Sequence, residues 1–201
     1  MRLIPNVLTL FRLVLAPWLA WLVLQSRYPE ALAVVGFAGV TDWLDGYTAR
    51  RLGAAGKLGV TLDPLADKVL LVTLFIVLGY AAVIPRWLVA LVLGRDAVIV
   101  AGALLLRFFL NIRHFAPSTL GKVSTFFQIV FVLMALLAAV FDLSVVRWLR
   151  TLALILTALF TTLSWIDYVN RGIRMSRGAF EQGHSIRVRI MRGKSHSLND
   201  E

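Results

Sequence analysis

Six apolar segments, each about as long as a helix that crosses a bilayer, constrain the fold of this chain most. A hydrocarbon core about 30 Å thick needs roughly 20 helical residues. Segments of that length lie at about 7–25, 30–52, 59–80, 85–106, 122–141 and 146–167, with turn and polar residues between them. The composition agrees, because 59% of the residues are hydrophobic and only 16% are charged. The sequence therefore predicts an all-α integral membrane protein with six transmembrane helices.

The positions of lysine and arginine predict how these helices are oriented. If six helices alternate in direction, one side of the membrane receives Arg2, Arg50, Arg51, Lys57, Arg107, Arg113, Lys122 and the arginines of the C-terminal end. The other side receives Arg27, Arg86 and Arg147. Since cytoplasmic loops carry the excess of basic residues, we expect the first side, with both termini, to face the cytoplasm from the inner membrane.

The basic residues also bear on the partners of the chain. There are 21 Lys and Arg residues against 11 Asp and Glu, a net charge of +10. The basic residues lie between the apolar segments, so orientation and anionic lipid explain them, and we expect no nucleic-acid partner. Residues 1–168 are expected to form one domain, and residues 169–201 a basic cytoplasmic tail, solvated or partly disordered, on anionic headgroups. A regulatory or nucleic-acid-binding tail is the alternative.

Four carboxylates lie in or beside apolar segments. Asp42 and Asp45 share one face near the cytoplasmic end of the second segment, and Asp63 and Asp67 share one face near the start of the third. The short connection makes these two ends neighbours. Carboxylates at that depth repel one another and are costly to desolvate, so they need protons or counter-cations. Carboxylate oxygens suit Mg²⁺ or Mn²⁺, and two such cations would supply the missing charge.

These carboxylates belong to a longer pattern, D-x2-D-G-x2-A-R-x8-G-x3-D-x3-D. Its fixed positions are Asp42, Asp45, Gly46, Ala49, Arg50, Gly59, Asp63 and Asp67. The pattern resembles the signature of the CDP-alcohol phosphatidyltransferase family, and the resemblance extends over nearly all of residues 3–168. It implies a six-helix membrane enzyme that binds a CDP-linked lipid over two divalent cations, transfers its phosphatidyl group to an alcohol and releases CMP.

The resemblance assigns a role to each carboxylate. Asp42 and Asp63 would bridge or touch both cations, Asp45 would complete one cation site, and Asp67 would serve the other. Asp67 would also be the general base, because a carboxylate beside a metal can accept the proton of the attacking alcohol.

The resemblance also implies a binding surface for the CDP-linked lipid. Gly46 and Arg50 would contact the CDP moiety, whose pyrophosphate needs close backbone and a fixed positive charge. Gly59 would let the backbone approach the same ligand. The opening IPNVLTLFR looks like the family's P-N-x-L-T-x-x-R segment, whose polar residues lie near the nucleotide; here they are Asn6, Thr9 and Arg12. A capped helix end whose arginine reaches to the interface is the alternative for these three.

Basic residues further along the chain are candidates for binding the acceptor. Arg95, with Asp96 beside it, lies mid-segment, either in a buried ion pair that faces other polar groups or in the acceptor pocket. Arg107, Arg113 and Lys122 cluster on the cytoplasmic side, where orientation alone or an anionic acceptor explains them. Lys122 is the lysine of a G-K-x-x-T-x-x-Q segment like that of glycerophospholipid-making members.

Two hypotheses differ in the identity of the acceptor. The segments LDPLADKVLL, IPRWLVALVLGRDAVIV and LGKVSTFFQ look more like those of CMP-forming cardiolipin synthases, whose acceptor is phosphatidylglycerol. The competing acceptor is glycerol 3-phosphate, whose phosphatidylglycerophosphate synthases are expected to carry Arg-Glu-Phe where this chain has Arg95-Asp96-Ala97. The expected partners are CDP-diacylglycerol, this anionic glycerol-type acceptor and the bilayer, with a homodimer left open.

A small membrane transporter with an acidic cation site is the alternative of another class. A transport path should distribute polar groups through the membrane depth, whereas these acids concentrate at one side of the predicted bundle. The sequence therefore favours the enzyme.

Overall fold

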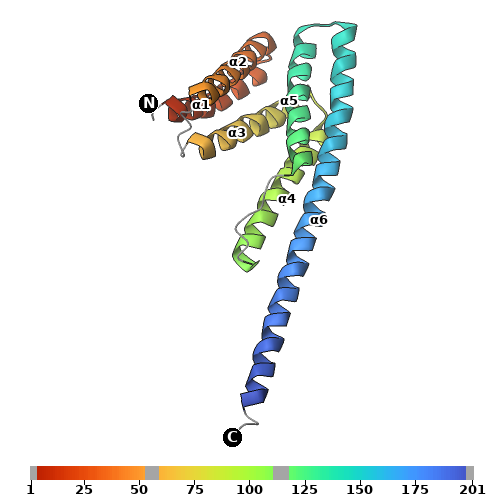
Figure 1. Cartoon of the computed structure of the whole chain (residues 1–201). Coiled ribbons are helices and arrows are strands. Elements are labelled where there is room, and N and C mark those ends of the chain that lie inside the picture. Colours follow the sequence, from red (N-terminus) through yellow and green to blue (C-terminus); the bar gives the residue numbers. More distant parts are fainter. Residues whose placement is uncertain (1–3, 53–58, 111–117, 198–201) are drawn as a thin grey trace.

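The computed structural model of the chain is all α-helical (Figure 1). It describes residues 4–52, 59–110 and 118–197, and among these the side chains of residues 13–41, 66–102, 104, 108 and 118–174. The helices are α1 (Ile4–Leu24), α2 (Tyr28–Leu52), α3 (Gly59–Tyr80), α4 (Arg86–Leu110), α5 (Thr119–Val140) and α6 (Ser144–Ser197). Each of the six apolar segments is therefore helical, as predicted.

Local signals explain where several of these helices begin and end. Ser26 and Ala82 have φ angles of 57° and 58°, and this left-handed backbone turns the chain after α1 and after α3. Pro85 directly precedes α4, a position that proline tolerates because its missing N–H is not needed there. At the start of α5, the hydroxyl of Ser118 accepts a hydrogen bond from the Gly121 N–H at 2.9 Å. Ser118 is thus the N-cap of this helix.

Helix α6 differs from the expectation at its C-terminal end. The predicted segment ends near residue 167, but α6 continues for 54 residues to Ser197. The expected partly disordered end is therefore helical over residues 169–197. The sequence explains the continuation, because no proline follows Pro117 and the segment is rich in arginine and other residues that favour helix. The division into a domain of residues 1–168 and a tail of residues 169–201 stays a prediction.

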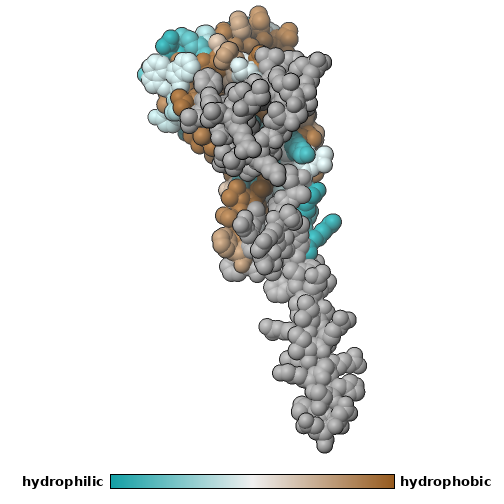
Figure 2. Space-filling view, turned by 60° about the vertical axis from the view of Figure 1, so that its left-hand side comes forward, coloured by the Kyte–Doolittle hydropathy of each residue, from teal (hydrophilic) through white to brown (hydrophobic). Residues whose placement is uncertain are grey.

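Two helices are long and apolar enough to span a bilayer by length and composition, counting only the described part of the chain. They are Thr119–Val140, which is α5, and Ser144–Arg174 within α6. Large apolar side chains also lie exposed on the outer faces of the helices, including Val14, Phe37, Phe108, Val145 and Trp148. Figure 2 shows such hydrophobic surface in brown. Exposed apolar surface on this scale is typical of a protein that contacts lipid.

The hydrophobic core joins helices from both halves of the chain. Helices α5 and α6 run antiparallel side by side, α4 packs along α6, and α1–α3 form a group on one side of α5 (Figure 1). Phe75 of α3 and Phe131 of α5 are both fully buried, with their ring centroids 6.3 Å apart. Leu19 and Val23 of α1 and Leu88 of α4 belong to the same buried cluster. This core fixes α3 against α1 and α5, which positions the candidate site.

Candidate functional site

The signature carboxylates lie on the helices that the sequence predicts. Asp42 and Asp45 are in the C-terminal part of α2, and Asp63 and Asp67 are in the first turns of α3. Only residues 53–58 join the two helix ends, so the connection keeps these ends close along the chain. The side chains of the first three carboxylates lie outside the described residues. Their convergence with Asp67 therefore stays a prediction.

Several other predicted site residues have a described backbone but no described side chain. Asn6, Thr9 and Arg12 lie in α1, Gly46 and Arg50 in α2, Gly59 at the start of α3, and Arg107 in α4. Arg113 falls in residues 111–117, outside the described part of the chain. The helical placement of the first group agrees with the predicted segments, and their contacts with a ligand remain predictions.

A cavity of about 480 Å³ lies between α2, α3 and α5. Its lining residues are Val35, Gly36, Ala38, Gly39, Val40, Asp67, Lys68, Leu70, Leu71, Leu74, Thr125, Ile129, Val132 and Leu133. Most of this lining is aliphatic, and Asp67 and Lys68 are its charged members. On the α2 wall, a Cβ added at Gly36 or Gly39 would meet nothing within 4 Å, so both glycines leave space. The cavity thus combines an apolar interior with the last carboxylate of the signature.

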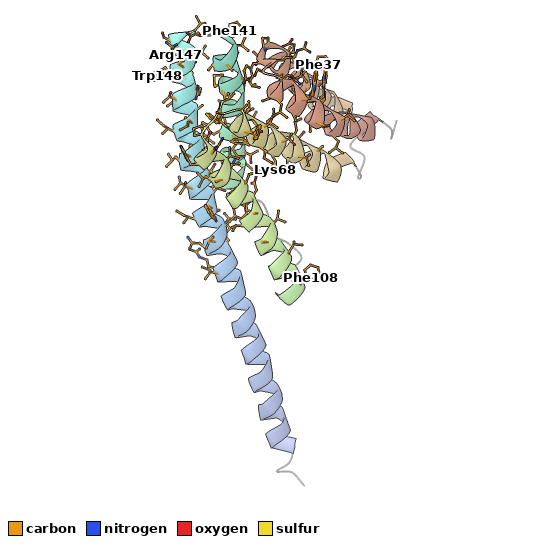
Figure 3. All side chains as sticks on the ribbon, turned by 180° about the vertical axis from the view of Figure 1, so that it is seen from behind. Phe37, Lys68, Phe108, Phe141, Arg147 and Trp148 are labelled. Carbon is orange, nitrogen blue, oxygen red and sulfur yellow. The ribbon has the colours of Figure 1, made fainter. Side chains whose placement is uncertain are left out.

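Lys68, the residue after this carboxylate, is held by a partner on α4. Its Nζ lies 2.6 Å from Oδ2 of Asp96, and the two side chains are 31% and 13% exposed. Figure 3 labels Lys68 beside the ribbon of α3, which lies close to α4 and α5 there. The ion pair therefore links α3 to α4 at the wall of the cavity.

Arg95 forms the centre of a buried polar network. Its Nη1 donates to Oδ1 of Asp96 at 2.9 Å, and its Nε and Nη2 donate to Oγ of Ser164 on α6 at 3.2 and 2.9 Å. Nη2 also lies 3.4 Å from the carbonyl oxygen of Gly121 on α5. The guanidinium carbon is 5.4 Å from the centroid of the Tyr168 ring. Arg95 is thus in the buried ion pair that the sequence left open as an alternative, and it joins α4, α5 and α6.

The glycine of the G-K-x-x-T-x-x-Q segment makes this network possible. A Cβ at Gly121 would lie 2.9 Å from Nη2 of Arg95 and 2.9 Å from the hydroxyl oxygen of Tyr168. Tyr168 in turn accepts a hydrogen bond from the Ser118 N–H at 3.1 Å. The absent side chain therefore leaves the room in which the α4 and α6 side chains meet the start of α5.

The polar residues at the three fixed positions Lys, Thr and Gln of this pattern have different surroundings. Lys122 is exposed, Thr125 lines the cavity, and Gln128 is fully buried. Nε2 of Gln128 lies 3.3 Å from the hydroxyls of both Ser124 and Thr161, so this amide serves the contact between α5 and α6. Lys122 therefore presents a positive charge at the surface, Thr125 contributes to the cavity wall, and Gln128 holds α5 against α6.

Sequence reasoning missed the partners of the central pair. Lys68 directly follows the last carboxylate of the signature, and Ser164 and Tyr168 are spaced i, i+4 on one face of α6. Polar residues at helical spacing inside an apolar segment were the signal that could have found the last two. Which helix they face depends on tertiary packing, which no local pattern contains.

Comparison with known proteins agrees with the signature. The family described as CDP-alcohol phosphatidyltransferase matches residues 2–163. The chain is 35% identical over 178 residues to a CDP-diacylglycerol–glycerol-3-phosphate 3-phosphatidyltransferase of Aquifex aeolicus, covering 86% of this chain and 97% of that protein. It is 34% identical over 185 residues to the human cardiolipin synthase (CMP-forming), covering 84% of this chain and 61% of that protein. The chain belongs to the CDP-alcohol phosphatidyltransferase family, which is a family of membrane proteins, and it is an enzyme of phospholipid biosynthesis.

Proposed function

We propose that the protein transfers the phosphatidyl group of CDP-diacylglycerol to a glycerol-type alcohol and releases CMP. The observation that carries this proposal is the complete carboxylate signature on α2 and α3, within a chain whose family match covers residues 2–163. The family assignment sets aside the transporter hypothesis.

The proposed centre holds two divalent cations, Mg²⁺ or Mn²⁺. The donor set fits these ions, because Asp42, Asp45, Asp63 and Asp67 offer the carboxylate oxygens that both prefer. When bound, the cations supply positive charge that offsets the charge developing on the departing CMP. Asp67 accepts the proton of the acceptor hydroxyl as its oxygen attacks the β-phosphorus, which strengthens an otherwise weak nucleophile.

Residues near the cytoplasmic ends of the first helices are proposed to bind the CDP moiety. Arg50 provides fixed positive charge for the pyrophosphate, and Gly46 and Gly59 allow close approach of the backbone. The remaining proposed contacts are Asn6, Thr9 and Arg12 of α1. The aliphatic lining of the cavity supports a lipid substrate, since acyl chains gain from leaving polar surroundings.

Phosphatidylglycerol is the proposed acceptor, which makes the protein a cardiolipin synthase. The Arg95-Asp96-Ala97 sequence supports this choice, because glycerol 3-phosphate enzymes are expected to carry Arg-Glu-Phe there. Arg107, Arg113 and Lys122 are proposed to attract the anionic acceptor. Arg95 is better placed to hold α4, α5 and α6 together than to touch substrate, because its nitrogen atoms bond to Asp96, Ser164 and Gly121.

Glycerol 3-phosphate is the second candidate acceptor. The relative from Aquifex aeolicus favours it, since the chain aligns with 97% of a protein named for that acceptor. With either acceptor, six helices are proposed to cross the inner membrane with the carboxylates facing the cytoplasm.

One assay separates the two acceptors. The purified full chain in detergent micelles receives CDP-diacylglycerol, Mg²⁺ or Mn²⁺, and either phosphatidylglycerol or glycerol 3-phosphate. We expect CMP release and cardiolipin formation with phosphatidylglycerol, at a kcat/KM at least tenfold above that with glycerol 3-phosphate. The reverse ratio would make the second candidate correct, and no CMP release with either acceptor would refute the proposed function.

A further inference from the structure

Lys68 adds a second positive charge beside Asp96, which already pairs with Arg95. Oδ2 of Asp96 is 2.6 Å from Nζ of Lys68, and Oδ1 is 2.9 Å from Nη1 of Arg95. One carboxylate thus lies between two cations, and the three side chains together have a net charge of +1. Arg95 alone would neutralise Asp96. The other carboxylate of the cavity lining, Asp67, is assigned to the divalent cations of the proposed centre, which leaves the charge of Lys68 available to an anionic substrate.

The position of Lys68 suggests where this surplus charge acts. Lys68 lines the cavity between α2, α3 and α5, as do its chain neighbour Asp67 and Thr125 of α5. An ammonium group has three N–H donors, so the bond to Asp96 does not exhaust its capacity to bind an anion. In apolar surroundings a surplus charge interacts far more strongly with an anionic group than it would in water.

Asp96 is held in place from several sides. Arg95, which bonds to it, is 5% exposed and is itself tied to Ser164 of α6 and to the carbonyl of Gly121 on α5. A carboxylate braced in this way is a fixed anchor for a long and flexible lysine side chain. Without the anchor, the long side chain of Lys68 would be free to adopt other rotamers.

We propose that Lys68 binds a phosphate group of a substrate in this cavity and that Asp96 is the residue that positions it. The inference rests on the proposed function, since it takes the cavity as the place where a phosphate-bearing lipid or acceptor binds. The phosphate belongs either to CDP-diacylglycerol or to the acceptor. Both offer the same oxyanion to the ammonium group.

Steady-state kinetics of purified full-length variants test this proposal. Lys68→Met should raise KM for one of the two substrates about 10- to 100-fold, as expected for loss of a charge-assisted hydrogen bond, with kcat within about threefold of wild type. A rise for CDP-diacylglycerol identifies the activated lipid as the source of the phosphate, and a rise for the acceptor identifies the acceptor. Lys68→Arg, which keeps the charge, should recover at least half of the loss on a logarithmic scale.

Variants of Asp96 test the positioning role. Asp96→Asn should raise KM for the same substrate as Lys68→Met, and Asp96→Glu should restore it in part. The double variant of Lys68→Met with Asp96→Asn should be no worse than Lys68→Met alone, because both remove one interaction. Asp142→Asn is the matched control, since it breaks an exposed ion pair with Arg147 outside the cavity and should leave both KM values unchanged.

The results that overturn the inference are distinct from those that overturn the proposed function. Unchanged KM values in Lys68→Met, or a parallel loss of kcat and thermal stability without a KM change, would leave Lys68 a structural residue. If Lys68→Met does not purify folded, Lys68→Gln and Asp96→Asn are judged by the same criterion. Absence of CMP release by wild type would instead refute the proposed function.

Discussion

Arg95 and Ser164 are joined by a hydrogen bond of 2.9 Å although they are 69 residues apart in sequence. The bond ties α4 to α6, and both residues are buried. Through Asp96 and Lys68 the same network reaches α3, where the last signature carboxylate lies. The polar interior of this apolar protein therefore connects the cavity wall to the two C-terminal helices.

Loss of the Ser164 hydroxyl should measurably weaken this connection. Ser164→Ala removes the acceptor of two Arg95 bonds and leaves a buried cation undersatisfied. We expect a loss of about 2 kcal/mol, or roughly 4–8 °C in Tm for a chain of this size. Thr162→Ala is the control, because Thr162 is exposed and bonds to its own helix backbone. Equal Tm values for the two variants in detergent would contradict the role given to Ser164.

A side chain at Gly121 should disrupt the same network by crowding. The Cβ of Gly121→Ala would lie 2.9 Å from Nη2 of Arg95, whose position is fixed by its other bonds. We expect destabilisation of about 1–3 kcal/mol, the usual effect of overpacking. Gly172→Ala on α6 meets nothing within 4 Å and should be neutral or slightly stabilising, by up to about 1 kcal/mol. A thermal-shift comparison in which Gly121→Ala is as stable as wild type would count against the crowding argument.

Substitutions of Asp67 and Asp42 should impair the enzyme in different ways, because these two carboxylates have different assigned roles. Asp67→Asn should abolish turnover, by about 10²-fold or more, while CDP-diacylglycerol binding is largely kept, because a general base is lost. Asp42→Ala should instead weaken binding of the divalent cation and, with it, of the CDP-linked lipid. Calorimetric titration with Mn²⁺ and CDP-diacylglycerol, alongside CMP release, separates the two. Unchanged activity in either variant would remove that residue from its assigned role.

Filling the cavity should impair lipid use without unfolding the protein. Gly39→Leu places a large side chain where a Cβ meets nothing within 4 Å, so the helix itself should tolerate it. Since Gly39 lines the cavity, we expect KM for CDP-diacylglycerol to rise about tenfold or more, the effect of losing roughly 1.4 kcal/mol of binding. Gly102→Leu on α4, which also has open space around its Cβ but lies outside the cavity lining, is the control. Identical KM values in the two variants would show that substrate does not enter this cavity.

The fold was largely predictable because its strongest signal is local. The length of each apolar segment and the turn residues between segments predict the helices, and the observed ends of α1 to α5 fall within a few residues of the predicted ones. The sequence does not predict the end of α6, because a basic polar composition is typical of disordered tails although it does not by itself break a helix.

Only those parts of the site that a sequence motif encodes were predictable. The signature placed Asp67 near the start of the third helix, and the structure puts it in the wall of the cavity. The sequence also singled out Arg95 and Asp96, but not Lys68, Ser164 or Tyr168 as their partners. Those contacts depend on how α4 packs against α3 and α6, which is decided by the whole core and not by any spacing within one helix.

Metal-dependent CMP release tests whether the signature carboxylates hold divalent cations for cleavage of CDP-diacylglycerol. The purified protein is stripped with EDTA and assayed with CDP-diacylglycerol and phosphatidylglycerol or glycerol 3-phosphate, before and after Mg²⁺ or Mn²⁺ is restored. We predict no release without the cation, full recovery with it, and no recovery in Asp67→Asn. Release that is unaffected by EDTA, or that persists in Asp67→Asn, would show that the signature carboxylates do not hold cations for this reaction.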